Sequence, residues 1–342
     1  MSIELARETT KRQWEVKKLT ERDLELLFGL YFMRTLTVQQ LYDKYFESSS
    51  KRYTYLRLHQ LKKAGYVESR PLINEEGYKR GAYYSVTKKG IDTLVHKGKI
   101  DSSSVGDHST IIRRACKNRP SRKEIKSMIE RNSIYLILEK AGWTIIESRD
   151  FKRINGLNRG SVVKGGIRTD DGKEYALYVL AKTPRKYTVK KILTELKNSH
   201  IRNVIILMKS TVAYQEIITE RRLILDEMNI LPYKIGLNIL KKFPSDRSFV
   251  NIFTNFGVVS NVLNKHQFGK YLMITPSGEE KYICNYLLGD EMAIRFLKKY
   301  TWDRYELDGK KVVLFIWDNQ LLELGKGYEH VEIVQIPFDI QV

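Results

Sequence analysis

The sequence predicts an α+β protein in which a small N-terminal domain precedes a larger region of mixed helices and strands. Within residues 1–97, three segments with helical spacing of apolar residues are followed by a hairpin and a further helix. Beyond residue 120, helical segments alternate with short apolar runs that end at turn residues, as expected for a mixed sheet. Of the 342 residues, 42% are hydrophobic, which is enough for two cores.

Three helices are expected at the start of the chain. Their predicted ranges are residues 21–33, 38–46 and 51–63. Thr20 and Thr37 precede the first two, and a threonine in that place can accept a hydrogen bond from the first helical turn. Gly65 follows the third, because glycine readily adopts the left-handed conformation that ends helices. Helical spacing predicts that the buried stripe of the third helix is Tyr55, Leu58 and Leu61.

A hairpin and a fourth helix complete the domain. Residues 66–69 and 82–86 are the expected strands, with the tip at residues 74–81. Thr87 is the expected cap of a helix over residues 88–96. This order of elements is that of a winged helix-turn-helix. The predicted organisation is a winged helix in residues 1–97, a basic linker in 98–120, an α/β domain in 121–245 and a C-terminal α/β extension in 246–342.

The region after residue 120 is expected to mix helices and strands without an internal repeat. The predicted helices cover residues 122–141, 188–197, 213–228 and 290–299. The predicted strands cover residues 143–147, 161–167, 173–181, 204–208, 271–275, 281–287, 311–317 and 331–336. The turn Asp170-Asp171-Gly172 predicts a hairpin between the second and third of these strands.

The net charge of +20 is concentrated in one part of the chain. Residues 51–200 carry 34 Lys or Arg and 15 Asp or Glu, whereas residues 201–342 carry 18 and 17. A basic surface attracts phosphates, and the release of condensed counterions then drives binding to nucleic acid. The charge distribution therefore predicts a nucleic-acid partner.

The third helix and the hairpin tip carry the predicted DNA contacts. In a helix-turn-helix, the N-terminal half of this helix enters the major groove. An Arg side chain matches the two acceptors of guanine, and a Gln side chain matches adenine. The residues expected to reach DNA are Ser50, Lys51, Arg52, Tyr53, Arg57 and Gln60 on the helix, and Tyr78, Lys79 and Arg80 on the wing.

Two further clusters of positive charge are predicted to follow the phosphate backbone beyond this domain. One begins in the linker and the other surrounds Pro184. Their members are Arg113, Arg114, Lys117, Arg119, Arg122 and Lys123 in the first, and Lys182, Arg185, Lys186, Lys190 and Lys191 in the second.

Four short motifs in the first hundred residues occur together. They are Leu19-Thr20-Glu21-Arg22-Asp23, Leu36-Thr37, the series Leu58, Leu61, Ala64-Gly65-Tyr66-Val67, and Thr87-Lys88-Lys89-Gly90. Together they resemble the winged helix of the replication-relaxation family over residues 19–97. Members of that family are carried by plasmids and conjugative elements. The resemblance implies sequence-specific DNA binding in replication, in transfer or mobilisation, or in transcriptional control on a plasmid, phage or conjugative element.

The middle of the chain loosely resembles a restriction-endonuclease-like core, with a helix, strands around a hairpin and another helix. Such a core needs an acidic residue at a strand end and another two positions before a lysine, because these carboxylates hold a metal ion that activates water. Residues 162–165 contain no Asp or Glu, and residues 179–181 before Lys182 contain none either. Asp170, Asp171 and Glu174 belong to a turn. We therefore expect a catalytically degenerate core without catalytic residues, metal or cofactor.

Two alternatives to a DNA-binding regulator stay open: a metal-dependent DNA nuclease with a winged-helix head, and a protein-interaction module of a mobile-element complex. The expected partner is double-stranded DNA, together with a second copy of the chain or other plasmid replication and transfer proteins. No segment approaches the roughly 18 apolar residues of a membrane helix, and the first residues lack a signal-peptide core. Cys116 and Cys284 lie far apart, so a reducing cytoplasm without a membrane partner is expected.

Overall fold

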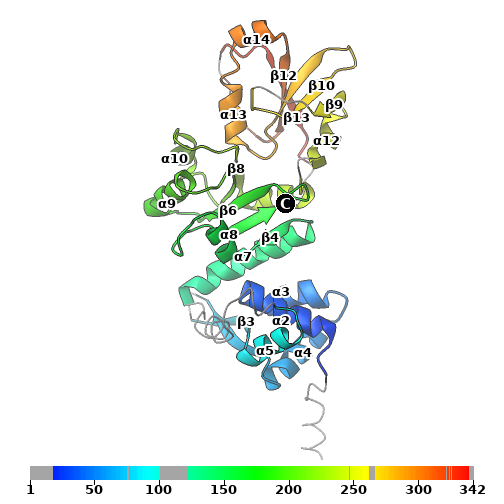
Figure 1. Cartoon of the computed structure of the whole chain (residues 1–342), viewed down its shortest axis with the longest axis vertical. Helices are drawn as coiled ribbons and strands as arrows, with labels where there is room; N and C mark the ends of the chain where they lie inside the picture. Colours follow the sequence, from blue (N-terminus) through cyan, green and yellow to red (C-terminus); the bar gives the residue numbers. More distant parts are fainter. Residues whose placement is uncertain are drawn as a thin grey trace, which may run out of the picture. The chain divides into compact units, whose positions relative to one another are not determined.

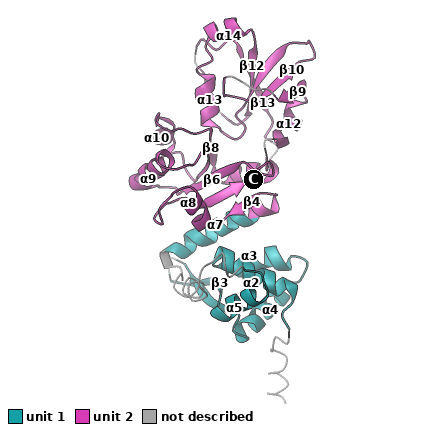
Figure 2. Ribbon diagram, in the orientation of Figure 1, with its two compact units in different colours: residues 1–136 teal, residues 137–342 magenta. Residues whose placement is uncertain are grey.

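The computed structural model divides the chain into two compact units, residues 1–136 and 137–342 (Figure 2). The structure describes residues 18–74, 77–100, 122–245, 247–261, 266–320, 322, 324 and 326–338. Unit 1 is rich in helices and unit 2 contains two sheets (Figure 1). Helices and strands occur in both units, which confirms the predicted α+β class.

Unit 1 contains the helices and the hairpin expected from the sequence. Its elements are α2 (Glu21–Met33), β1 (Leu36–Thr37), α3 (Val38–Leu41), the π-helical turn η1 (Tyr42–Phe46), α4 (Lys51–Lys63), β2 (Val67–Ile73), β3 (Lys79–Val86) and α5 (Lys88–His96). The strands form an antiparallel sheet in the order β1-β3-β2, and β2 and β3 make the wing. The first, third and fourth helices have the predicted bounds, whereas the second becomes π-helical after Leu41.

The core of unit 1 corrects the predicted buried stripe of α4. Leu58 and Leu61 are fully buried, but Tyr55 is 58% exposed and Thr54 takes the third buried position. Positions i, i+4 and i+7 lie on one helix face, so Thr54, Leu58 and Leu61 share a stripe. Tyr55 lies about 100° further round the helix. The hydroxyl of Thr54 also donates to the backbone oxygen of Ser50 at 3.4 Å.

The division between the units falls inside the long helix α7 (Arg122–Lys140), further along the chain than the predicted boundary between residues 97 and 120. The side-chain amide of Asn132 donates to the backbone oxygens of Met33 (3.2 Å) and Thr35 (2.5 Å). The amide of Gln40 donates to the backbone oxygen of Ile129 at 2.9 Å. These bonds make the first part of α7 a component of unit 1, while most of the predicted linker lies outside the described residues.

A buried ion pair connects α4 to the start of α2. Asp23 is 1% exposed, and its carboxylate accepts a hydrogen bond from Arg57 Nε at 2.9 Å while it also pairs with Nη2 of that guanidinium. The same carboxylate accepts from the backbone N–H of Thr20 at 2.8 Å and so completes the N-terminal capping box of α2. Burial alone would raise the pKa of Asp23, but the bonds from Arg57 and Thr20 outweigh it and leave this pKa below its ordinary value.

The first sheet of unit 2 has five strands in the order β4-β5-β6-β7-β8. Strands β4, β5 and β6 are antiparallel, and β6, β7 and β8 are parallel. The elements are β4 (Thr144–Ile146), α8 (Ser148–Ile154), β5 (Gly165–Arg168), β6 (Glu174–Leu180), α9 (Lys186–Lys197), β7 (Asn203–Met208), α10 (Tyr214–Ile218), β8 (Glu227–Pro232) and α11 (Tyr233–Lys242). The predicted hairpin at Asp170-Asp171-Gly172 is confirmed as the connection between β5 and β6.

The second sheet of unit 2 also has five strands, in the order β13-β12-β11-β10-β9. Strands β9, β10 and β11 are antiparallel, and β11, β12 and β13 are parallel. The elements are α12 (Arg247–Phe253), β9 (Val258–Asn261), β10 (Tyr271–Ile274), β11 (Glu280–Asn285), α13 (Glu291–Leu297), α14 (Trp302–Asp308), β12 (Lys311–Trp317) and β13 (Val331–Ile336). We call the segments 122–232 and 247–336 the first and second repeats, because each has a helix, three antiparallel strands, a helix and two parallel strands.

The hairpins of the two repeats agree in detail, although no internal repeat stands out in the sequence. In the first, Arg168 pairs with Glu174, and in the second, Ile274 pairs with Glu280. Each turn begins with a threonine whose hydroxyl accepts from the backbone N–H four residues later, at 3.0 Å and 3.1 Å. Each turn has a left-handed glycine, with φ of 88° and 83°. Within the hairpins the two sequences share little beyond Thr-x-x-Gly-x-Glu, which is too short a signal to recognise in advance.

Another prediction is wrong in the type of element. Residues 213–228 are predicted to be one helix, but α10 ends at Ile218 and β8 begins at Glu227. Met228 and Ile230 are buried in the apolar core that also contains residues of α9 and β7. Residues 219–226 are neither helix nor strand, and only Glu227 and Met228 of the predicted helix lie in β8, where burial in the sheet overrides the helical period. Among the described residues, the unpredicted elements are β1, α8, α11, α12, α14 and β9.

The buried pair in unit 1 predicts a large stability effect. We expect Asp23→Asn to lower the free energy of unfolding by about 3 kcal/mol at neutral pH, because the largely buried charge of Arg57, whose side chain is 14% exposed, would lose its partner. Urea unfolding of both proteins measures this difference. The difference should shrink as the pH falls below about 4, since Asp23 has a lowered pKa in the folded state and its contribution disappears when it is protonated.

The matched control is Glu21→Gln on the same helix. Glu21 pairs with Lys99, but the two side chains are 62% and 38% exposed, so the change should alter stability by less than about 1 kcal/mol. Equal effects of the two substitutions would contradict a special role for the buried pair.

Candidate nucleic-acid interface

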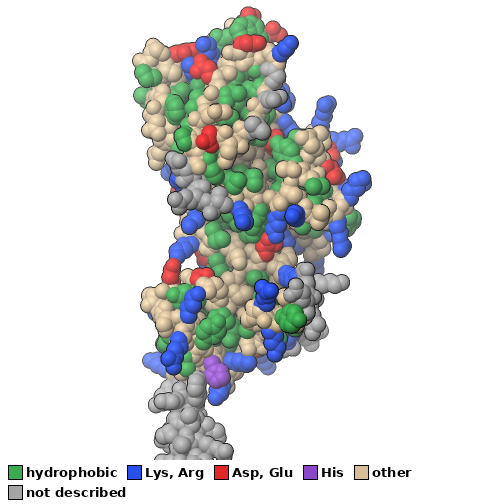
Figure 3. Space-filling model, turned by 180° about the vertical axis from the view of Figure 1, so that it is seen from behind, with side chains coloured by type: hydrophobic (Ala, Val, Ile, Leu, Met, Phe, Trp, Pro, Cys, Tyr) green, Lys and Arg blue, Asp and Glu red, His purple; other side chains and the backbone are tan. Residues whose placement is uncertain are grey.

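The exposed face of α4 is the strongest candidate site in unit 1. The hydroxyl of Ser50 accepts from the backbone N–H of Tyr53 at 3.1 Å and so caps the helix at its N-terminus. The helix contains no Asp or Glu. Its positive residues are Lys51, Arg52, Arg57, Lys62 and Lys63. In Figure 3, Lys and Arg side chains are prominent over the visible face of unit 1.

The wing adds positive charge next to two glycines. Lys79 and Arg80 are exposed at the start of β3, and the ring of Tyr78 is 70% exposed. Gly77 and Gly81 on either side have φ of 89° and 110°, which a residue with a side chain rarely adopts. No atom of the described residues lies within 4 Å of the place where a Cβ would be at either glycine. The tip is therefore open to a partner along its backbone as well as its side chains.

The structure separates the predicted contacts on α4 into two groups. Arg57 uses its guanidinium to bind Asp23, and its Nη1 donates to Gln60 Oε1 at 3.0 Å. Arg57 therefore holds α4 to α2, and Gln60 on the same helix orients its guanidinium, a positioning role that the sequence pattern does not indicate. The side chain of Arg52 is exposed and forms no hydrogen bond or ion pair with any described residue, and the same holds for the side chains of Lys79 and Arg80.

Two tyrosines on the same face extend the candidate surface. Tyr53 is 44% exposed, and its ring meets the edge of Phe46 at a centroid distance of 6.0 Å. Tyr55 is 58% exposed, although helical spacing predicts a core position for it. Starting the helical count at Thr54 instead of Tyr55 would have identified Tyr55 as a surface residue.

The second predicted basic cluster lies on α9 in unit 2. Arg185, Lys186 and Lys190 are exposed, and Lys191 is partly buried. Lys and Arg side chains stand out along the edge of unit 2 where α9 lies (Figure 3). Most of the first predicted cluster, namely Arg113, Arg114, Lys117 and Arg119, lies outside the described residues. Arg122 and Lys123 belong to the first turn of α7, and their side chains are not among those described.

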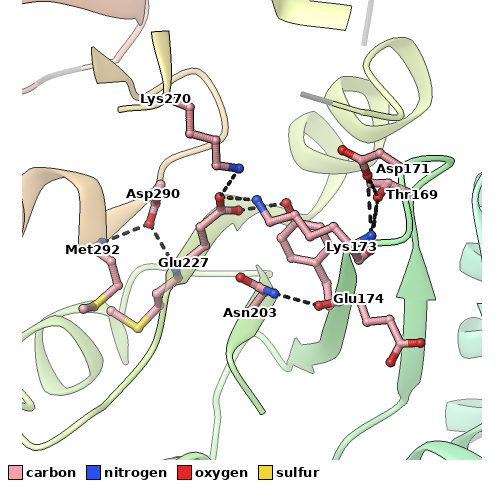
Figure 4. A network of polar contacts seen from close by, with 11 residues as sticks. Thr169, Asp171, Lys173, Glu174, Asn203, Glu227, Lys270, Asp290 and Met292 are labelled. Carbon is pink, nitrogen blue, oxygen red and sulfur yellow. Dashed lines mark hydrogen bonds and ion pairs between the residues drawn. The ribbon is translucent and has the colours of Figure 1, made fainter. Parts of the chain in front are cut away.

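A polar cavity of about 780 Å³ lies in unit 2 between the two repeats. Glu227 accepts from the hydroxyl of Tyr175 at 2.8 Å and forms ion pairs with Lys173 and Lys270 (Figure 4). Asn229 also lines this cavity and is 1% exposed, and neither of its amide atoms has a hydrogen-bond partner among the described residues. The residues that line the cavity therefore link the two repeats through ion pairs, and the amide of Asn229 among them lacks a hydrogen-bond partner in the described part of the chain.

Asp290 is the second polar link between the repeats. Its Oδ1 accepts from the backbone N–H of Met228 in β8 at 2.9 Å and from that of Met292 in α13 at 3.0 Å (Figure 4). Burial raises the pKa of this carboxyl to about 7, with a further contribution from the nearby charge of Glu227. One acidic side chain thus holds a strand of the first repeat against a helix of the second.

Among the described residues, no group of three or more His, Cys, Asp and Glu side chains is placed to hold a metal ion. No helix in that part of the chain is long and apolar enough to cross a membrane.

In unit 1, a basic, exposed helix is thus followed by a two-stranded hairpin, an arrangement that the sequence predicts to be a winged helix-turn-helix. No family model matches the chain, and no curated protein matches it. A solved structure that is similar is described as a protein with a GntR superfamily winged-helix-turn-helix domain from Halomicrobium mukohataei. The similarity covers 38% of this chain and 86% of that chain, with 16% identity and a TM-score of 0.23. The resemblance to the replication-relaxation family stays a prediction from the quoted motifs.

The raised pKa of Asp290 predicts how stability depends on pH. The folded state binds the proton more tightly than the unfolded chain, so the carboxyl destabilises the fold progressively as the pH rises from about 4 to about 7. Asp290→Asn keeps an oxygen that can accept from Met228 and Met292. We expect it to be roughly 2–4 kcal/mol more stable than the parent at pH 8 and nearly equal to it at pH 4, as measured by urea unfolding.

Asp226→Asn is the control, because Asp226 lines the same cavity but is exposed. Its stability difference from the parent should stay nearly constant over this pH range. A constant difference for Asp290→Asn would show that Asp290 is already ionised or already neutral throughout the range in the folded protein.

Proposed function

We propose that this chain is a sequence-specific double-stranded DNA-binding protein and that α4 and the wing form its DNA-binding surface. The observation that carries the proposal is the exposed Arg52 on a helix without carboxylates, next to a wing with Lys79 and Arg80. Exposed cations with no intramolecular partner among the described residues are available to phosphates and base edges.

The start of α4 is the part best suited to face DNA. Ser50 caps the helix, and no acidic residue lies in the first turn. The free N–H groups there and the helix dipole favour a negative group, and Lys51 and Arg52 add full positive charges. The pair between Arg57 and Asp23 holds the helix so that this end is presented in one orientation.

The proposed biological setting rests on the resemblance of residues 19–97. We propose that the protein belongs to a plasmid, phage or conjugative element and acts in replication, in transfer or mobilisation, or in transcriptional control. A map of the DNA bound in cells that carry such an element tests this setting. Sites at an origin of replication, an origin of transfer or a promoter would support the corresponding process.

We also propose that the first repeat is a degenerate restriction-endonuclease-like core. The order of a helix, three antiparallel strands, a helix and a parallel strand supports this. Where an active core would carry a metal-binding acid, the backbone N–H of Val162 donates to Glu195 at 2.8 Å, and the hydroxyl of Tyr178 donates to the same carboxylate at 3.2 Å. Glu195 therefore links the backbone at Val162 to the side chain of Tyr178. Incubation with supercoiled plasmid and Mg²⁺ or Mn²⁺ tests the rival nuclease: nicking that EDTA abolishes would favour it.

The remaining alternative is a protein-interaction module. It would be favoured if the protein bound no member of a random duplex library while it still bound a second copy or a replication or transfer protein. Sedimentation of the protein alone reports whether it forms a homodimer.

The residues of α4 and the wing should differ in the kind of contact they make. We expect Arg52→Ala to weaken binding to a selected cognate duplex by about 1–3 kcal/mol and to relax the preference at one base pair, as expected when an Arg–guanine pair is removed. Lys79→Ala with Arg80→Ala should weaken cognate and scrambled duplexes alike. For both duplexes, the slope of log affinity against log salt should fall by about one unit for each phosphate that the variant no longer neutralises.

Fluorescence anisotropy with both duplexes over a series of salt concentrations measures these effects. Lys97→Ala is the control, because Lys97 is an exposed cation at the end of α5, away from α4 and the wing in sequence. If the combined variant of Arg52, Lys79 and Arg80 stays folded and keeps the parent's affinity and sequence preference, this surface does not read DNA.

A further inference from the structure

We infer that the surface of α9 is a second, sequence-independent site that binds the phosphodiester backbone of nucleic acid. This site lies on unit 2 and is separate from the winged helix. It rests on the proposed function only in the choice of nucleic acid as the partner.

Positive side chains from two segments meet at this surface. Lys186 and Lys190 are exposed on α9, and Lys182 and Arg185 are exposed just before it. The Nζ atom of Lys191 lies beside Gly160, which brings the loop with the exposed Arg159 next to the helix. The hydrogen bond between Val162 and Glu195 holds the same loop against α9.

No carboxylate on α9 neutralises this surface. Glu195 is the one acidic residue of the helix, but it is 7% exposed and its two oxygens are engaged with Val162 and Tyr178. Lys186, Lys190 and Lys191 form no ion pair with any described residue. Lys197, by contrast, pairs with Glu220 at 2.6 Å and does not belong to the site. A group of unpaired cations around a satisfied, buried acid leaves a positive field for phosphates.

A tyrosine lies among these cations. The ring of Tyr187 is 71% exposed, and Lys191 Nζ is 5.6 Å from its centroid. Single-stranded nucleic acid is typically bound by cations that follow the backbone and by aromatic rings on which bases stack. A duplex offers only its backbone to such a surface. A contribution of Tyr187 to binding therefore distinguishes single-stranded from double-stranded nucleic acid as the ligand.

The second repeat shows that the fold does not require an open, basic helix here. Its corresponding helix α13 carries Glu291, which is buried and accepts from the hydroxyls of Tyr214 (2.6 Å) and Tyr286 (2.5 Å). Arg295 of α13 donates to the backbone oxygen of Ile218 in the first repeat at 2.6 Å. The helix of the second repeat thus serves packing, whereas α9 in the same topological position stays open and positively charged.

The test uses the full-length protein with the triple variant Lys186→Gln, Lys190→Gln and Lys191→Gln. Glutamine keeps most of the side-chain length and a similar helix propensity but removes the charge. The probes are random-sequence duplex and single-stranded oligonucleotides without a selected site, titrated over a series of salt concentrations. We expect the slope of log affinity against log salt to fall by about two to three units, because each phosphate contact contributes close to one.

The matched control is Lys298→Gln, Lys299→Gln and Arg304→Gln, which removes three exposed cations from the second repeat. It should keep the parent's slope. The inference is overturned if the α9 variant, with an unchanged circular dichroism spectrum, keeps the parent's affinity and slope for both probes, or if the control loses as much as the α9 variant.

Two further variants complete the design. Tyr187→Ala should weaken binding of the single strand if bases stack on the ring, and should leave duplex binding unchanged. The winged-helix variant of Arg52, Lys79 and Arg80 should lose cognate preference but keep the contribution of α9. If that variant keeps its cognate preference, the proposed function of unit 1 fails, while the α9 result is judged by its own variant and control.

Discussion

The orientation of α4 in unit 1 depends on the pair between Asp23 and Arg57. One carboxylate caps α2 at Thr20 and holds the guanidinium of α4, so the start of one helix fixes the orientation of the other. A buried pair needs all its hydrogen bonds to offset the loss of hydration, and here Gln60 and the helix cap provide further partners. Arg57, which the sequence pattern predicts to contact DNA, is therefore the residue that positions α4, whereas Arg52 on the same helix is exposed.

The two repeats of unit 2 share one topology, but their corresponding helices α9 and α13 make different contacts. Both repeats place a helix between their antiparallel and parallel strands, and both use the same threonine–glycine turn in their hairpins. In the second repeat that helix packs through Glu291 and Arg295 onto the first repeat. In the first repeat it keeps its cations in solvent. Asp290 joins the two repeats, because its carboxylate accepts backbone N–H groups from β8 and α13.

Local chemistry explains which parts of the fold could be predicted. Thr20 and Thr87 cap their helices with bonds inside one turn, and the hairpin at Gly172 needs only a left-handed residue between two strands. Such features depend on residues within a few positions of one another, so they can be recognised from the sequence. The helix predicted for residues 213–228 is wrong because α10 ends at Ile218, an irregular segment follows, and burial in the sheet selects a strand from Glu227 onward.

The sequence by itself determined the order of helices and hairpin in unit 1, the basic character of α4 and α9 and the positions of most strands, since these follow from capping residues, apolar period and charge. The tertiary structure decided which of the charged side chains are available to a partner. Arg57 and Arg52 are five positions apart on one helix, yet one faces the carboxylate of α2 and the other faces solvent. It also decided that the second half is a repeated fold, because strand order and register depend on contacts between residues far apart in the chain, and two sequences can satisfy the same contacts with different side chains.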